Sequence, residues 1–232
     1  RLFEPFDGVR AAIPGTHDIW MHGWNAESSW EIHEQRLPEL FAAQGFHPLH
    51  IEPLRIGDVG VVGSMGWYDY SFRDDIGIAL DVYATKAFPG TPRAVWGDRI
   101  YARFPFDDVE LTHRLTDRLS AHLRDVGAAS QVIGVVHHLV HRDLRPLHHF
   151  RSVMPIQWRF LNTFLGSDCL GEPLLAHPAV TQVFCGHVHR AKTLERAGKR
   201  LTSIGGDYRK KQLIEANEHR TISRRLFRAP VS

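Results

Sequence analysis

The chain has 232 residues and a formal net charge of +2, with 43% hydrophobic and 23% charged residues. This balance is typical of a globular domain and excludes a disordered, collagen-like or coiled-coil chain. No apolar run approaches the roughly 20 residues that a membrane span needs. Two cysteines, Cys169 and Cys185, are too few for a disulfide framework. We therefore expect a cytoplasmic protein with a single domain over residues 1–232.

Charge is distributed unevenly along the chain. Residues 190–232 contain 12 Lys and Arg against 4 Asp and Glu. Such a segment either attracts a phosphate-bearing partner such as nucleic acid or protects a solvated sheet edge. Interleaved apolar residues favour the sheet edge. The chain begins at Arg1 rather than Met, which suggests that it is a piece of a longer protein.

Apolar residues recur with the periods of strands and helices in alternation. Asp107 or Asp108 caps the longest predicted helix, Gly127 ends it, and Gly57-Asp58 predicts a hairpin turn. Strands and helices in alternation, followed by a strand-rich end, predict a layered α/β domain. In chain order we expect a strand over residues 9–13, a helix over 29–43, strands over 49–56 and 59–62, an aromatic insertion over 68–106, a helix over 108–126, a strand over 131–136, a helix over 156–165, a strand over 181–185 and a hairpin over 192–204.

Three predicted strands each end in a polar cluster, and α/β sheets bind ligands outside the carboxyl ends of their strands. Neutral imidazoles bind Zn, Mn, Fe, Co and Ni, so the histidines of these clusters are candidate metal ligands. His137 and His138 point to opposite faces of a strand, so only one of them is expected to bind. The clusters are Gly15-Thr16-His17-Asp18, His137-His138 and Gly186-His187-Val188-His189.

In order, spacing and strand context, these clusters resemble the later motifs of the calcineurin-like metallophosphoesterase family. Those motifs are Gly-Asn-His-Asp, a His after a strand, and Gly-His-x-His. The resemblance implies two mixed β-sheets in a sandwich flanked by helices, with the first strands missing from this chain. It also implies metal-dependent hydrolysis of phosphomonoesters or phosphodiesters, in which a hydroxide bound to a two-metal centre attacks phosphorus.

The resemblance also implies a role for individual residues. Thr16 stands in place of the Asn, and because a hydroxyl is a poorer donor than an amide oxygen, it would weaken the metal site. His17 would act on the leaving group, and Asp18 would orient His17; the other reading of Asp18 is that it caps the loop. The implied metal ligands are Thr16, His137, His187 and His189, and the implied catalytic residues are His17 and Asp18. The implied cofactors are two divalent ions, Mn, Fe or Zn, and the expected partner is a small phosphorylated substrate.

The family's first two motifs, Asp-x-His and Gly-Asp-x-x-Asp, are absent from the 14 residues that precede Gly15. The bridging carboxylate is therefore missing, and a degenerate, non-catalytic binding protein is the alternative interpretation. A third interpretation is a hydrolase with a single zinc held by His137, His187 and His189. The aromatic residues of the insertion either stack a nucleobase or form core. The sequence leaves the substrate, the metal and the oligomeric state open.

Overall fold

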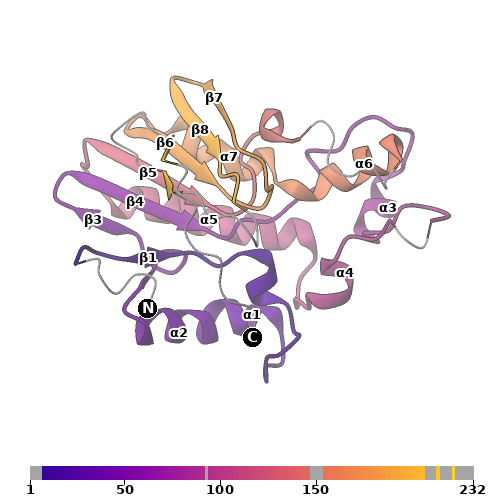
Figure 1. Ribbon diagram of the computed structural model, residues 1–232, viewed down its shortest axis with the longest axis horizontal. Coiled ribbons are helices and arrows are strands. Elements are labelled where there is room, and N and C mark those ends of the chain that lie inside the picture. Colours follow the sequence, from indigo (N-terminus) through magenta and orange to yellow (C-terminus); the bar gives the residue numbers. More distant parts are fainter. Residues whose placement is uncertain (1–6, 92–93, 147–153, 207–212, 215–220, 223–232) are drawn as a thin grey trace.

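The structure is a computed structural model that describes residues 7–91, 94–146, 154–206, 213–214 and 221–222. Its centre is a mixed six-stranded sheet (Figure 1). The four inner strands run parallel, and an antiparallel strand closes each edge. Across the sheet the order is β3 (Leu54–Ile56), β4 (Val59–Ser64), β5 (Gln131–Val136), β6 (Val180–Cys185), β8 (Lys199–Ser203) and β7 (Lys192–Arg196).

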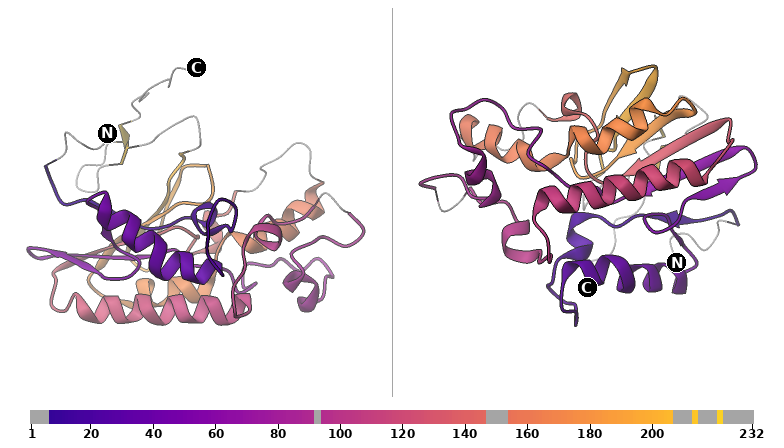
Figure 2. Two further views of the ribbon diagram at one scale, coloured as in Figure 1. Left: turned by 90° about the horizontal axis from the view of Figure 1, so that it is seen from below. Right: turned by 180° about the vertical axis from the view of Figure 1, so that it is seen from behind.

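Helices lie on both sides of this sheet. The α5–α7 pair packs together on one side, and the helix that runs from α1 to α2 lies on the other side of the strands (Figure 2). The sheet is thereby covered as the layered α/β class requires. The α-helices are α1 (Ser29–Glu31), α2 (Leu37–Ala43), α3 (Leu80–Ala84), α4 (Asp98–Tyr101), α5 (Asp108–Asp125), α6 (Pro155–Leu161) and α7 (Asp168–Ala176). The shorter helical turns are η1 (Thr16–Ile19), η2 (Ile32–Arg36), η3 (Arg142–Leu144) and η4 (Asn162–Leu165).

Two apolar clusters hold the layers together. The first lies between the sheet and the α5–α7 pair and includes Val62, Val132 and Leu119, all fully buried. The second is aromatic and gathers residues of the insertion, such as Trp67 and Tyr83, around the first half of α5 and around α6. The leucines of α5 recur at every fourth position, so one side of this helix contributes to both clusters.

Several predicted elements are confirmed. β3 and β4 form the hairpin predicted at Gly57-Asp58, and Gly57 has a φ of +60°, a conformation that favours glycine. The long helix is α5, whose cap, Asp107, accepts a hydrogen bond from the Glu110 N–H at 2.8 Å. The strands β5 and β6 and the β7–β8 hairpin also lie where the periodicity places them. At these positions the turn residues and the hydrophobic period predict the same elements.

The helix predicted over residues 29–43 is present, but its middle turn, η2, is a π-helix. The N–H of Leu37 bonds to the carbonyl of Ile32, five residues earlier. Pro38 follows and has no N–H to donate, so the α-helical hydrogen-bond ladder is interrupted at this point.

Three predicted elements differ from the structure. The strand predicted over residues 49–56 is shortened to β3, Leu54–Ile56. The strand predicted over residues 9–13 shrinks to β1 (Ala11–Ala12), which pairs in parallel with β2 (His47–Pro48) and not with the main sheet. The helix predicted over residues 156–165 is split between α6 and η4, and α7 follows it without having been predicted. Pro173 lies inside α7, and a proline in a helical pattern argues against a helix.

The predicted two-sheet sandwich is not confirmed. The described residues form one six-stranded sheet, and their remaining ladders are two-residue pairs, β1 with β2 and β9 (Leu213–Ile214) with β10 (Thr221–Ile222). Most of the basic end, and the start of the chain before residue 7, lie outside the described residues. In the described part, no helix has both the length and the apolar character for a membrane crossing.

Candidate functional site

The candidate site lies where three parallel strands end. β4, β5 and β6 are neighbours with the same direction, so their carboxyl ends share one edge of the sheet. Backbone bonds continue past these ends, from His137 N to the Ser64 carbonyl and from Gly186 N to the Val136 carbonyl, both at 3.1 Å. His137 and His187 therefore emerge at the edge where α/β sheets bind ligands.

Three polar atoms from the three predicted clusters converge at this edge. Thr16 is buried at the start of η1, and its Oγ1 lies 2.8 Å from Nε2 of His137 and 3.1 Å from Nδ1 of His187. The two ring nitrogens are themselves 3.1 Å apart. We call these three residues the site triangle. The structure thus brings together three of the six residues expected from the sequence.

Hydrogen bonding alone does not satisfy the site triangle. An imidazole nitrogen carries either a proton or a lone pair, so it donates or accepts but does not do both. In the contact between the two rings, one of the two nitrogens must lack its proton. The hydroxyl of Thr16 and the other nitrogen then supply at most two protons for the three contacts of the triangle. A divalent cation suits the arrangement better, because bonds of roughly 2.1 Å at about right angles place neighbouring ligand atoms roughly 3 Å apart.

The described residues do not supply a complete set of metal ligands. Over the described residues, no group of three or more His, Cys, Asp or Glu side chains is arranged to hold a metal ion. The site triangle offers two imidazoles and one hydroxyl in place of such a group. Nε2 of His187 is buried and has no hydrogen-bond partner in this part of the chain. The triangle therefore fits one face of a cation site, whose other ligands would be water or substrate.

Two glycines make room for the His137 ring. A Cβ on Gly15 would lie 2.9 Å from Cε1 of His137, and one on Gly186 would lie 3.1 Å from Nδ1 of the same ring. His187, which completes the turn after β6, has a φ of +64°, an uncommon value for a residue with a side chain. Backbone strain of this kind concentrates at functional sites. The loops are therefore shaped closely around these two rings.

Burial keeps both histidines of the site triangle neutral. It holds the pKa of His137 well below its usual value, and the nearby His138, His17 and His189 lower it further. Burial and the same neighbours hold the pKa of His187 well below its usual value too. A neutral imidazole has a free lone pair on one nitrogen, which is the form that binds a metal.

His138 lies beside the site triangle, with its ring 4.5 Å from that of His187, but it is not one of the three residues of the triangle. Its Nδ1 lies 3.0 Å from the carbonyl oxygen of Met65, and burial lowers its pKa to about 4. His137, and not His138, therefore contributes a ring nitrogen to the site triangle. Which residue of this adjacent pair binds a metal stays a prediction.

The remaining expected residues surround the triangle without joining it. His17 and His189 are exposed and close enough to interact electrostatically with each other and with the triangle. Burial lowers the pKa of His17, Asp18 raises it, and His189 lowers it. Asp18 also accepts a hydrogen bond from Gly15 N at 2.7 Å, so it caps the loop before η1.

The aromatic insertion is mainly core, as one of the two interpretations of the sequence holds: Trp67, Tyr68 and Tyr70 are buried. Two tryptophans, however, contact the site, and the sequence analysis did not identify this role. The Trp20 ring lies 4.0 Å from that of His17, and the Trp96 ring lies 5.6 Å from that of His187. No spacing marks these residues, because η1 and the insertion meet only in the folded chain.

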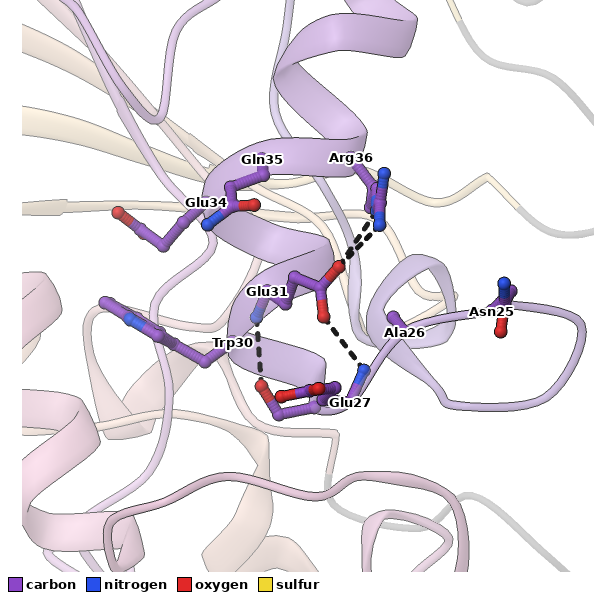
Figure 3. A pocket seen from close by; sticks show the side chains of 9 residues that line it. Asn25, Ala26, Glu27, Trp30, Glu31, Glu34, Gln35 and Arg36 are labelled. Carbon is purple, nitrogen blue, oxygen red and sulfur yellow. Dashed lines mark hydrogen bonds and ion pairs between the residues drawn. The ribbon is translucent and has the colours of Figure 1, made fainter.

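A separate cavity lies beside the first helix (Figure 3). It measures about 680 Å³ and is lined by residues 25–28, 30, 31 and 34–36. Two of its three carboxylates form ion pairs: Glu31 pairs with Arg36, and Glu34 with Arg118. None of the lining residues belongs to the three polar clusters, so the cavity is not part of the candidate site.

Comparison with known proteins finds a relative by fold only. No protein-family model matches the chain, and no curated protein matches its sequence. Among solved structures, the crystal structure of phosphopantetheinyl hydrolase from Mycobacterium tuberculosis is similar, with a TM-score of 0.63 and 18% sequence identity. The similarity covers 84% of this chain and 69% of that one. It shows that the two chains share a fold.

These comparisons correct the family assignment made from the motifs. The structure that resembles this chain bears the name of a phosphopantetheinyl hydrolase, and no family model supports assignment to the calcineurin-like metallophosphoesterases. The motifs behind that assignment are short, and two of the expected five are absent, so their order and spacing do not establish a family. The chain is an α/β protein that shares the fold of a hydrolase.

Proposed function

We propose that the protein is a metal-dependent hydrolase of phosphomonoesters or phosphodiesters. The observation that carries the proposal is the site triangle, in which Thr16, His137 and His187 present three donor atoms within 3.1 Å of one another at the carboxyl edge of the sheet. The shared fold with a phosphopantetheinyl hydrolase supports it. Sheets of this class bind ligands outside the carboxyl ends of their strands, which supports this edge as the place of the proposed hydrolytic site.

The triangle would hold one divalent cation, Mn, Fe or Zn. Such an ion supplies Lewis-acid polarisation of a phosphoryl oxygen and lowers the pKa of water. His189, exposed next to His17, is the residue we propose for a second ion. Oxygen ligands for that ion would come from water, from the substrate or from residues outside the described part of the chain.

His17 is positioned to exchange a proton with the leaving group. It is exposed at the mouth of the site, and Asp18 beside it favours its protonated form, against the lowering of its pKa by burial. Imidazole is the side chain most often used for proton transfer in catalysis. We propose that His17 donates to the ester oxygen while Asp18 holds the loop through its bond to Gly15 N.

The substrate is proposed to be small and phosphorylated. Phosphopantetheinyl esters are the first to test, because a solved structure with this fold is named for them. A non-catalytic binding protein remains the second candidate function. The observation that favours it is that no carboxylate completes the triangle into a group of three metal-binding side chains among the described residues.

The test is phosphoesterase activity of the full chain after chelation and reloading. Bis(p-nitrophenyl) phosphate, p-nitrophenyl phosphate and a phosphopantetheinyl ester are assayed with Mn²⁺ or Zn²⁺ added back. We expect metal-dependent turnover that His187→Ala abolishes, whereas His113→Ala, an exposed histidine on α5, retains it. Equal turnover by both variants, or no binding of either cation by the wild type, would exclude the metal-dependent mechanism.

A further inference from the structure

One buried carboxylate is connected to three histidines around the site. Asp98, the first residue of α4, is only 2% exposed. Its Oδ1 accepts from Nε1 of Trp20 at 2.8 Å, and its Oδ2 accepts from Nε1 of Trp96 at 2.8 Å and from the hydroxyl of Tyr68 at 3.1 Å. Three aromatic side chains from distant parts of the sequence are thus tied to a single residue.

Each of these rings packs on a different histidine. Trp20 lies 4.0 Å from His17, and Trp96 meets His187 edge to face at 5.6 Å. Tyr68 lies 5.9 Å from His138, whose ring in turn lies 4.5 Å from that of His187. A shift of the carboxylate would therefore move the surroundings of all three imidazoles at once.

The backbone is shaped to hold this arrangement. A Cβ on Gly97 would lie 3.0 Å from the Trp20 ring, so glycine lets the indole lie against the start of α4. The N–H of Met21 bonds to the Tyr101 carbonyl at 2.7 Å, which ties the end of η1 to the end of α4. The segment that carries His17 is thereby fixed to the helix that carries Asp98.

A buried carboxylate is costly unless it is fully hydrogen-bonded. Burial raises the pKa of Asp98 to about 6, against the lowering effect of its three donors. A neutral amide or an apolar residue would be easier to bury, so packing alone does not account for an aspartate here. The aspartate is instead accounted for by its three hydrogen-bond donors, which both of its carboxylate oxygens accept from.

We propose that Asp98 is a positioning residue for the site. It fixes Trp20, Trp96 and Tyr68, and these rings set the orientation of the imidazoles that would bind the cation and donate the proton. The proposal rests on the proposed function for its catalytic meaning, but ring orientation is measurable without metal or substrate. Supporting residues of this kind commonly change metal affinity by about tenfold or more when they are replaced.

Asp108 provides a matched control. It is also buried and accepts from three donors, Trp67 Nε1 at 2.8 Å, Lys86 Nζ at 2.7 Å and the hydroxyl of Tyr70. Of its two aromatic donors, Trp67 contacts His138 at 5.2 Å, and the structure records no ring contact of either with His17 or His187. Asp108→Asn therefore disturbs a comparable buried network, which reaches His187 through His138 and not by a direct ring contact.

The experiment compares Asp98→Asn with Asp108→Asn in the full, metal-free chain at pH 8. NMR resonances of the His17 and His187 rings report ring currents from the neighbouring indoles. We expect Asp98→Asn to shift both resonances and to weaken Mn²⁺ binding about tenfold. We expect Asp108→Asn to leave both resonances in place, although both variants lose stability in urea. Unmoved resonances in Asp98→Asn would overturn the proposal.

Two provisions keep the outcomes distinct. If the wild type binds no divalent cation, the proposed function fails, while the metal-free resonances still decide the role of Asp98. If Asp98→Asn does not fold, Tyr68→Phe replaces it, because it removes one tether and keeps the ring. That variant is expected to shift the His138 resonance and to leave His17 unchanged; an unshifted His138 resonance would then refute the proposal.

Discussion

Oγ1 of Thr16 lies 2.8 Å from Nε2 of His137, although 121 residues separate them. Thr16 reaches this position from a loop, whereas His137 follows the central strand β5. Nδ1 of His187 lies 3.1 Å from both atoms. The hydroxyl is thus the one oxygen in a triangle that otherwise consists of imidazole nitrogens, and its removal is the most direct test of that triangle.

We expect Thr16→Val to lower Mn²⁺ affinity by at least about tenfold. Valine has nearly the same shape but no oxygen, so the side chain still fills its buried position while one ligand is lost. Thr16→Ser keeps the hydroxyl and is expected to bind Mn²⁺ within about threefold of the wild type. Calorimetric titration of the chelated protein measures both, and equal affinities for the two variants would argue against a ligand role for Thr16.

Gly15→Ala is expected to impair the site more than the fold. Gly15 has a φ of −103°, which alanine adopts freely, but the new Cβ would lie 2.9 Å from the His137 ring. We expect the ring to be displaced, with an activity loss of at least about tenfold. The free energy of unfolding should change by less than about 1 kcal/mol, because the atom that the new Cβ meets is at the far end of a side chain that can turn.

Gly60→Ala is the matched control for that variant. Its Cβ would also meet a neighbour at 2.9 Å, in this case Val126 at the end of α5. Overpacking there should cost about 1–3 kcal/mol of stability and leave Mn²⁺ affinity unchanged. If Gly15→Ala instead lost stability without losing metal affinity, the glycine would serve the fold and not the site.

Much of the sheet, and the position of the site within it, could be predicted from the sequence. β5 and β6 are short apolar runs followed directly by histidines, and parallel strands place such ends at one edge. Local periodicity carries this information. Thr16 was also predicted to join His137 and His187, on the strength of motif order. The family drawn from the same motifs was nevertheless wrong, which shows that convergence of side chains and family membership are separate inferences.

Other features depend on contacts that no local pattern encodes. Asp98 follows a glycine in an insertion without clear periodicity. The positioning role that we propose for it depends on the hydrogen bond from Trp20 at the end of η1, which forms only in the folded chain. α7 was missed because Pro173 interrupts its pattern. Its packing depends on Gly171, whose Cβ position lies 2.0 Å from the Val140 carbonyl oxygen. Such close backbone approaches are decided by tertiary structure.

Gly171→Ala is therefore expected to destabilise the fold strongly. The added methyl cannot fit against a backbone oxygen without moving α7 away from the segment after β5, so we expect a loss of about 3 kcal/mol or more. Glu172→Ala, an exposed change in the same helix, should stay within about 0.5 kcal/mol of the wild type. Urea unfolding measures the stability of both variants. Similar unfolding midpoints would show that α7 can move to accommodate the methyl group without a loss of stability.

Stability is expected to fall in acid because of histidines buried beneath the first helix. His33 and His50 are almost fully buried, with ring centroids 4.8 Å apart. Burial lowers the pKa of His50 to about 3 and lowers that of His33 as well. Burial raises the pKa of Glu34, but its bonds from His33 and Arg118 outweigh this and bring it to about 2.

The sign of the effect follows from proton binding. Below its ordinary pKa of 6.5, His50 is protonated in the unfolded chain, whereas in the folded chain it is not protonated until about pH 3. The unfolded state therefore binds more protons across this window, and stability is lost as the pH falls through it. Glu34 acts in the same direction below its ordinary pKa of 4.5. His50→Gln, whose amide can still donate to the His33 carbonyl, should flatten the slope between pH 6 and pH 4 by about 1.4 kcal/mol per pH unit. Urea titrations at half-unit steps measure this slope, and an unchanged slope in His50→Gln would assign the acid lability to other groups.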